Sequence, residues 1–140
     1  MTRLLFTGSR HWANPAPAEN YIKRAVARAV EQNFSIIVGD AHGVDEWVWR
    51  AAAEHKYPKI VVYGITPKPR NGAPGVYLNT GFGPDGEFPL TGFLHRDRYM
   101  ASLADLCLAV WNGTSRGAKY TYDACKKRGI ESHLIEPLVK

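Results

Sequence analysis

The sequence has few cysteines and no long hydrophobic run. Its 140 residues include only two cysteines, Cys107 and Cys125, and these do not form a CxxC pair. We therefore expect two reduced thiols in a cytoplasmic protein rather than a disulfide framework. No stretch reaches the roughly 18 consecutive apolar residues of a membrane span, and the apolar run at the N-terminus is too short for a signal peptide.

Two familiar nucleotide-binding motifs are also missing. No GxGxxG opens a helix and no GxxxxGK[ST] occurs, which argues against a standard dinucleotide dehydrogenase and a Walker-type ATPase. The histidines do not show the spacing of metal ligands, so we expect no bound metal and no cofactor. They are His11, His42, His55, His95 and His133.

The composition is that of one globular domain spanning residues 1–140. Hydrophobic residues make up 45% and charged residues 22% of the chain, which is enough apolar material for a core. The formal net charge is +5. This charge favours an anionic ligand, although by itself it is weak support for binding to nucleic acid.

Apolar runs alternate with segments of helical period along the chain. The runs are nearly continuous, as in parallel strands covered on both faces, and lie at Leu4–Thr7, Phe34–Val38, Lys59–Tyr63, Leu106–Trp111 and His133–Ile135. Amphipathic stripes occur between them, over residues 21–30, 44–52, 93–104 and 118–125. The alternation predicts an α/β protein with a Rossmann-like, open, mainly parallel five-stranded sheet and helices on both faces.

Residues 65–92 form a long insertion loop in this prediction. Six of the 28 residues are glycine and five are proline, so we expect no regular helix to cross the segment. Its Gly83-Pro84-Asp85-Gly86 sequence suits a turn, around which a small hairpin could form. The loop either faces a ligand or another subunit, or is an insertion without such a role.

Three of the predicted strands end in glycine-rich sequences with hydroxyl and charged side chains. Ligands of open α/β sheets bind beyond the carboxyl ends of the strands, where glycines and helix N-termini can hold a phosphate. A plain strand-to-helix turn is the alternative for each end. The predicted ligand-binding residues at these ends are Thr7, Gly8, Ser9, Arg10, Gly39, Asp40, Ala41, Gly43, Asp45, Asn112, Gly113, Thr114, Ser115, Arg116 and Gly117.

Single residues in these segments allow more than one role. Asp45 is placed to cap the following helix. Alternatively, Asp40 or Asp45 could meet ribose hydroxyls or act as a base. Arg10 and Arg116 could each make bidentate contacts to a phosphate. Trp47 falls on the core stripe of its helix whereas Trp49 falls off it, which indicates an exposed tryptophan at a subunit interface or a stacking surface. We expect a homodimer or homotetramer.

Three stretches together resemble a known superfamily. TGSR, VGDAHGVDEWVWRAA and LHRDRYMASLADLCLAVWNGTSRGAKYTYDACKKRGI are similar to the SLOG superfamily of Rossmann-like domains, and this resemblance covers most of the chain outside residues 65–92. That superfamily contains the DNA-processing protein A (Smf) proteins and the LOG enzymes, and the layout is closest to small stand-alone members of unassigned function. The resemblance implies a nucleotide or nucleotide-derived ligand held over the glycine loops.

The resemblance to LOG enzymes is incomplete. Arg96 and Met100 match the R-K-x-x-M helix of these nucleotide hydrolases, which adds Arg96 to the predicted site. Gly117 is not followed by the glutamate of their G-G-x-G-T-x-x-E element, and Asp123 is the nearest acid.

Three functions follow from these observations. The first is binding or sensing of a nucleotide or nucleotide derivative, with its phosphate on the loops after the first and fourth strands. The second is N-glycosidic hydrolysis of a nucleoside 5′-monophosphate, with Arg96 and Asp45 as candidate catalytic residues. The third and less favoured is a single-stranded DNA-binding module, because Arg116, Lys119 and residues 126–128 are basic.

Overall fold

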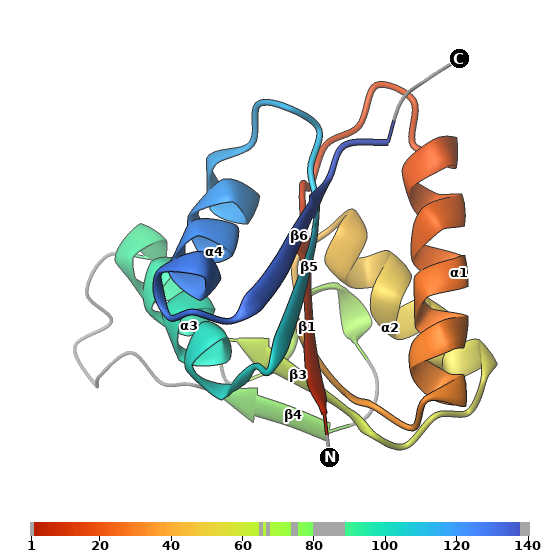
Figure 1. Ribbon diagram of the computed structural model, residues 1–140. Helices are drawn as coiled ribbons and strands as arrows, with labels where there is room; N and C mark the ends of the chain where they lie inside the picture. The colour runs from red at the N-terminus through yellow and green to blue at the C-terminus, as the bar shows by residue number, and fades with distance from the viewer. Residues whose placement is uncertain (1, 65, 67, 74–75, 80–88, 138–140) are drawn as a thin grey trace.

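A parallel six-stranded sheet runs through the middle of the molecule (Figure 1). The computed structural model describes residues 2–64, 66, 68–73, 76–79 and 89–137. The strands lie in the order β4-β3-β2-β1-β5-β6, and every neighbouring pair is parallel. Their bounds are β1 Arg3–Gly8, β2 Ser35–Gly39, β3 Ile60–Gly64, β4 Val76–Asn79, β5 Leu106–Val110 and β6 Glu131–Ile135.

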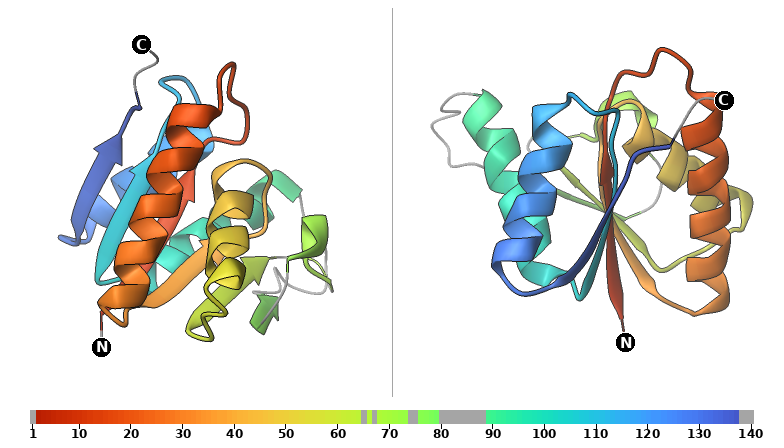
Figure 2. Two further views of the ribbon diagram at one scale, coloured as in Figure 1. Left: turned by 90° about the vertical axis from the view of Figure 1, so that its right-hand side faces the viewer. Right: turned by 45° about the horizontal axis from the view of Figure 1, so that its top comes forward.

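Helices cover the two faces of the sheet in pairs. On one face lie α1 (Ala16–Glu31) and α2 (Val44–Glu54), and on the other lie α3 (Pro89–Leu103) and α4 (Arg116–Lys127), as Figures 1 and 2 show. A short 3₁₀ turn, η1, spans Arg70–Gly72 between β3 and β4. The predicted α/β class, with a Rossmann-like parallel sheet between two helical layers, is therefore confirmed.

The predicted strand count of five is one too low. The additional strand, β4, lies inside residues 65–92, and α3 also begins within that segment, at Pro89. The sequence VYLN of β4 is short and follows a stretch rich in glycine and proline, so its strand propensity is masked by its neighbours. The hairpin predicted around Gly83-Pro84-Asp85-Gly86 lies outside the described residues.

Alternate residues of the central strand β1 enter two separate cores. Leu4 and Phe6 pack with the apolar stripe of α1 and with α2, whereas Leu5 packs with Met100 of α3 and Cys125 of α4. This alternation follows from the period of two in a strand that is covered on both faces.

The prediction that Trp49 is exposed is wrong. Its side chain is buried, with 4% of its surface accessible, and it belongs to the core beneath α2. Helix α2 packs against α1 as well as against the sheet, so its buried face is wider than one apolar stripe. Trp47 is instead half-buried, with its ring centroid 6.1 Å from that of Trp12. Trp49 thus provides no subunit contact.

The strand order reverses between β1 and β5. β1 continues through α1 into β2 on one side, whereas β5 pairs with β1 from the other side after a long excursion of the chain. As a result, the β1–α1 and β5–α4 loops meet at the carboxyl edge of the sheet (Figure 1). This is the place where open α/β sheets bind ligands.

Candidate functional site

A cleft of about 1080 Å³ opens at this edge of the sheet. Its volume is sufficient for a small organic ligand. It is lined by Thr7, Gly8, Arg10, His11, Ala41, Asp45, Arg70, Arg96, Asp97, Trp111, Asn112, Thr114, Ser115, Arg116, Gly117, Ala118, Lys119, Tyr120 and Asp123.

Asn112 joins the two loops that meet at the reversal of strand order. Its backbone N–H donates to Ser9 Oγ at 2.9 Å and its side-chain Nδ2 donates to the carbonyl of His11 at 2.8 Å. Its Oδ1 accepts hydrogen bonds from the backbone N–H groups of Thr114 and Ser115, each at 2.9 Å. The wall formed by these two loops is therefore fixed before any ligand arrives.

The first turn of α4 forms part of the same wall. Ser115 is its N-cap but makes no side-chain capping hydrogen bond, and Arg116, Gly117 and Ala118 all line the cleft. The first N–H groups of a helix lack partners within the helix and carry the positive end of its dipole. This turn can therefore accept an anion. The backbone N–H of Ser9, by contrast, donates to the carbonyl of Val110 at 3.0 Å and is already used.

Two arginines on these loops make no ion pair with any residue that the structure describes. Arg10 follows β1 and Arg116 opens α4, and both side chains are exposed at the cleft. Lys119, one turn further along α4, is paired with Asp123 at 2.8 Å. Arg10 and Arg116 are thus the cations at the cleft whose charge is not balanced by a neighbouring carboxylate in the described part of the chain.

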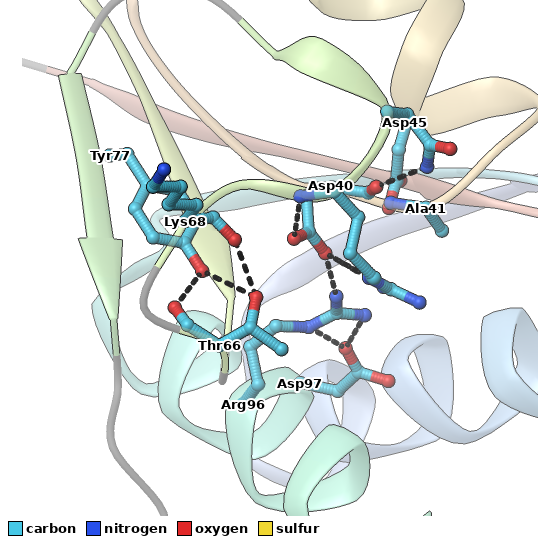
Figure 3. A network of polar contacts seen from close by, with 10 residues as sticks. Asp40, Ala41, Asp45, Thr66, Lys68, Tyr77, Arg96 and Asp97 are labelled. Atoms are coloured by element: carbon cyan, nitrogen blue, oxygen red, sulfur yellow. Dashed lines mark hydrogen bonds and ion pairs between the residues drawn. The ribbon is translucent and has the colours of Figure 1, made fainter. Parts of the chain in front are cut away.

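The opposite wall of the cleft is built on a buried carboxylate, Asp40, at the end of β2 (Figure 3). Arg70 donates to it from its backbone N–H at 2.9 Å, from Nε at 3.0 Å and from Nη2 at 2.7 Å. Arg96 donates from Nη1 at 3.1 Å, and Asn71 Nδ2 donates to the Asp40 carbonyl at 2.8 Å. Asp40 therefore ties the β3–β4 connection and α3 to the sheet.

Arg96 lies between two carboxylates. Besides its contact with Asp40, its Nε and Nη2 donate to Oδ1 of Asp97 at 3.0 and 2.8 Å (Figure 3). Burial alone would lower the pKa of Arg96, but Asp97 and then Asp45 raise it above its ordinary value. Its positive charge is consequently neutralised within the protein, although its side chain reaches the cleft.

Asp45 is the third buried carboxylate of this wall. Burial raises its pKa to about 7, against the opposing influence of Arg96 and of the Ala41 N–H, which donates to Asp45 Oδ2 at 3.2 Å. This contact closes the loop before α2, and α2 itself has no side-chain cap. The capping role considered for Asp45 is therefore not what the structure shows. An acid that titrates near neutral pH in a cleft is suited to proton transfer or to a hydrogen bond with a ligand.

At two positions behind the cleft, neighbouring atoms lie so close to the backbone that only glycine fits. A Cβ on Gly39 would lie 2.6 Å from Asp45 Oδ2 and 3.0 Å from the Arg96 guanidinium carbon. Gly43 has φ of +77°, and a Cβ there would lie 2.5 Å from the carbonyl oxygen of Ser9. Gly39 thus allows the close packing of the acidic wall, formed by Asp40, Asp45 and Asp97, whereas Gly43 lets the loop before α2 approach the β1–α1 loop. Neither glycine lines the cleft.

The structure brings most of the predicted site residues together. Those that line the cleft are Thr7, Gly8, Arg10, Ala41, Asp45, Arg96, Asn112, Thr114, Ser115, Arg116 and Gly117. The others lie behind its walls or at the turn after β5, namely Ser9, Gly39, Asp40, Gly43 and Gly113. Asp40 in particular is 0% exposed and paired with two arginines, so it is not available to ribose hydroxyls in this arrangement.

Sequence reasoning missed Arg70, Asp97 and Trp111. Asp97 was detectable as the acid next to Arg96, whereas Arg70 lies in the irregular segment that gave no periodic signal. Among the described residues, no cluster of three or more His, Cys, Asp or Glu side chains could hold a metal ion. No described helix has the length and apolarity needed to cross a membrane.

No protein-family model matches the sequence, and no curated protein is significantly similar to it. Solved structures are more informative. DNA processing protein A from Helicobacter pylori superimposes with a TM-score of 0.75 at 17% identity, over 99% of this chain and 67% of that one. That protein binds single-stranded DNA.

Two further structures share the same fold. DNA processing protein A from Streptococcus pneumoniae matches with a TM-score of 0.74 at 21% identity, over 99% of this chain. The chain spans about half of that protein, 51% of its length. The molybdenum cofactor binding protein from Rippkaea orientalis matches with a TM-score of 0.74 at 13% identity, over 95% of this chain and 75% of that one.

The chain has the Rossmann-like fold of these proteins. The fold that the sequence resemblance implies is therefore confirmed. The cleft lies at the reversal of strand order, between the β1–α1 and β5–α4 loops and the acidic wall at the end of β2 and the start of α2.

Proposed function

We propose that this protein binds a nucleotide or nucleotide derivative in the cleft at the carboxyl edge of the sheet. The observation that carries the proposal is the first turn of α4 next to two arginines, Arg10 and Arg116, without carboxylate partners in the described chain. A helix N-terminus with adjacent guanidinium groups matches the charge and the geometry of a phosphate. The phosphate would lie against the N–H groups of Arg116 and Gly117.

The rest of the cleft suits the remainder of such a ligand. Asp45 faces the cleft from the opposite wall and, with a pKa near 7, can donate or accept a hydrogen bond with a sugar hydroxyl. Trp111 and Tyr120 add aromatic surface against which a base could stack. The solved structures with this fold include proteins described as binding single-stranded DNA or a molybdenum cofactor, both of which carry phosphate groups.

Two measurements test the proposal. Mass spectrometry of the small molecules released when the purified protein is denatured would identify a co-purified ligand. Calorimetric titration with a panel of nucleoside monophosphates would then measure affinity for the protein and for Arg10→Ala and Arg116→Ala. Each substitution removes a charge-assisted contact of about 1.5–3 kcal/mol, so we expect the affinity to fall at least about tenfold.

Arg128→Ala is the matched control, because Arg128 is exposed at the opposite end of α4. We expect its nucleotide affinity to equal that of the unmodified protein, and the folding stability of all three variants to change by less than about 0.5 kcal/mol. Unchanged affinity in both cleft variants would contradict the proposal. Unfolding of Arg10→Ala would show instead that the loop after β1 is structural.

N-glycosidic hydrolysis of a nucleoside monophosphate is a second candidate function, favoured by the buried Asp45 at the cleft. In this reaction water adds to the anomeric carbon of the sugar, the bond to the base breaks, and the base leaves with a proton. Asp45 is placed to exchange a proton near neutral pH. Chromatographic detection of free base, lost in Asp45→Asn, would support hydrolysis, and binding without released base would support the sensing function.

Binding of single-stranded DNA is the third possible function, and the same binding measurements can detect it. Phosphate contacts by Arg10, Arg116 and Lys119 would make its affinity fall steeply as salt concentration rises. An oligonucleotide that binds with such a salt dependence, while mononucleotides do not bind, would assign the cleft to nucleic acid.

A further inference from the structure

A second groove, of about 640 Å³, lies between α1 and the β5–β6 edge of the sheet. Its lining shares no residue with the cleft described above. The floor is apolar and consists mainly of Leu4, Phe34, Leu106, Leu108 and Ile135, and α1 forms one side with Tyr21, Arg24, Ala25, Arg28, Ala29 and Gln32. His133 completes the lining.

The described helices cover this face of β5 and β6 only in part: Leu106, Leu108 and Ile135 are half-buried and pack at the margin of the core beneath α1. Leu106 and Leu108 alternate with Cys107, which faces α3 and α4 in the other core, so the two leucines point toward the α1 side. Helix α4 packs against β5 and β6 from the opposite face, as Figures 1 and 2 show. Parallel strands are normally buried on both faces. The apolar floor of the groove is therefore a surface that another element can cover.

The rim of the groove carries positive charge. Arg24 and Arg28 lie one helical turn apart on α1, both are exposed, and neither forms an ion pair with a described residue. Both also act on the Tyr21 hydroxyl: burial raises the pKa of Tyr21, and the two guanidinium groups oppose that rise. The lining contains no aspartate or glutamate.

We infer that this groove binds an amphipathic helix of another polypeptide, with an apolar stripe on the floor and Asp or Glu residues beside Arg24 and Arg28. Such a helix would bury the side chains of Leu106 and Leu108 and pair the two arginines. A second copy of this chain fits less well. A two-fold contact through the groove would place the same basic, acid-free lining against itself.

The test uses two labelled model peptides of about 15 residues, which span about four helical turns. Both carry leucines on one face; one has glutamates along the flank and the other has lysines at the same positions. Fluorescence anisotropy with the intact protein measures their affinities. We expect the acidic peptide to bind at least about tenfold more tightly than the basic one, because opposite charges meet only in the first case.

The double variant Arg24→Glu/Arg28→Glu should reverse this preference. The matched control is Lys126→Glu/Lys127→Glu, which changes the net charge by the same amount on exposed residues of α4, away from the groove. This control should keep the preference for the acidic peptide. Circular dichroism would check that both variants are folded, and nucleotide binding in the cleft should be the same in both.

Several results would overturn the inference. These are equal binding of the two peptides, binding of neither, or the same effect from the α4 control as from the α1 variant. A concentration-dependent dimer in sedimentation that is abolished by Leu108→Glu, together with absent peptide binding, would assign the groove to a second copy instead. Loss of nucleotide binding alone would contradict the proposed function and leave the groove unaffected.

Discussion

The two walls of the cleft use arginine in opposite ways. On the acidic wall, Arg70 and Arg96 are held by Asp40 and Asp97, and the carboxylate of Asp40 is fully buried. On the wall formed by the β1–α1 and β5–α4 loops, the loop wall, Arg10 and Arg116 are exposed and have no carboxylate partner in the described chain. The presence of an arginine at a cleft therefore says little about its role. Its burial and its partners separate an arginine that holds the protein together from one available to a ligand.

Arg96→Ala tests the acidic wall and should have the largest effect. The substitution leaves Asp40 and Asp97 with one guanidinium fewer in a buried setting, so we expect a loss of about 3–5 kcal/mol in the free energy of unfolding. Urea denaturation followed by circular dichroism measures this loss. Arg116→Ala is the control from the loop wall and should lose less than about 0.5 kcal/mol. If both variants were equally stable, the distinction between the walls would not hold.

Asp45→Asn tests the third carboxylate of the acidic wall through its pH dependence. The folded-state pKa of about 7 exceeds the ordinary value of 3.8, so between these values the folded protein keeps a proton that the unfolded chain has released. The associated stability is fully present below about pH 4 and is lost as the pH rises through about 7.

The variant should therefore match the unmodified protein near pH 4 and exceed its stability at pH 8 by at least about 1 kcal/mol. Urea midpoints measured from pH 4 to pH 8 check this difference. Parallel pH profiles for the two proteins would show that Asp45 is accommodated as a charge without penalty.

Lys119→Met should have the smallest effect, although Lys119 lines the cleft. Its ammonium group is already paired with Asp123 one turn along α4, in a largely exposed pair. We expect a stability change below about 0.5 kcal/mol. Affinity for a nucleoside monophosphate, measured by calorimetry, should fall less than in Arg116→Ala. An equal or greater loss of affinity would show that an ion pair with a neighbouring carboxylate does not prevent a cation of the cleft from binding the nucleotide.

The fold was predictable because its signal is local and repeated. A continuous apolar run such as 34–38 predicts a buried strand, and a stripe of helical period such as 21–30 predicts a helix. The alternation of the two predicts a parallel sheet. β4 escaped this reasoning because four residues between glycine and proline carry too little pattern. The burial of Trp49 was not predicted, because an apolar stripe indicates one buried face whereas α2 packs against both α1 and the sheet.

The site was predictable in its position and less so in its chemistry. Strand ends converge at one edge in any parallel sheet, so the loops around Arg10 and Arg116 were correctly expected there. The pairing of Asp40 with Arg70 and Arg96 depends on residues 30 and 56 positions away. No periodicity encodes such pairs, and this is why Asp40 was predicted to meet a ligand.

The hydrogen bond between Asn112 and Ser9 joins residues that are 103 positions apart, and β1 must pair with β5 before it can form. An N-terminal fragment that ends before β5 contains the first glycine loop and the acid Asp45 but lacks the loop and helix turn that complete the cleft. Contacts of such long sequence separation form slowly, because closing the chain between them costs entropy. Ligand binding in this cleft would therefore require β5 and the first turn of α4, so a growing polypeptide could form α1, α2 and α3 before it is able to bind.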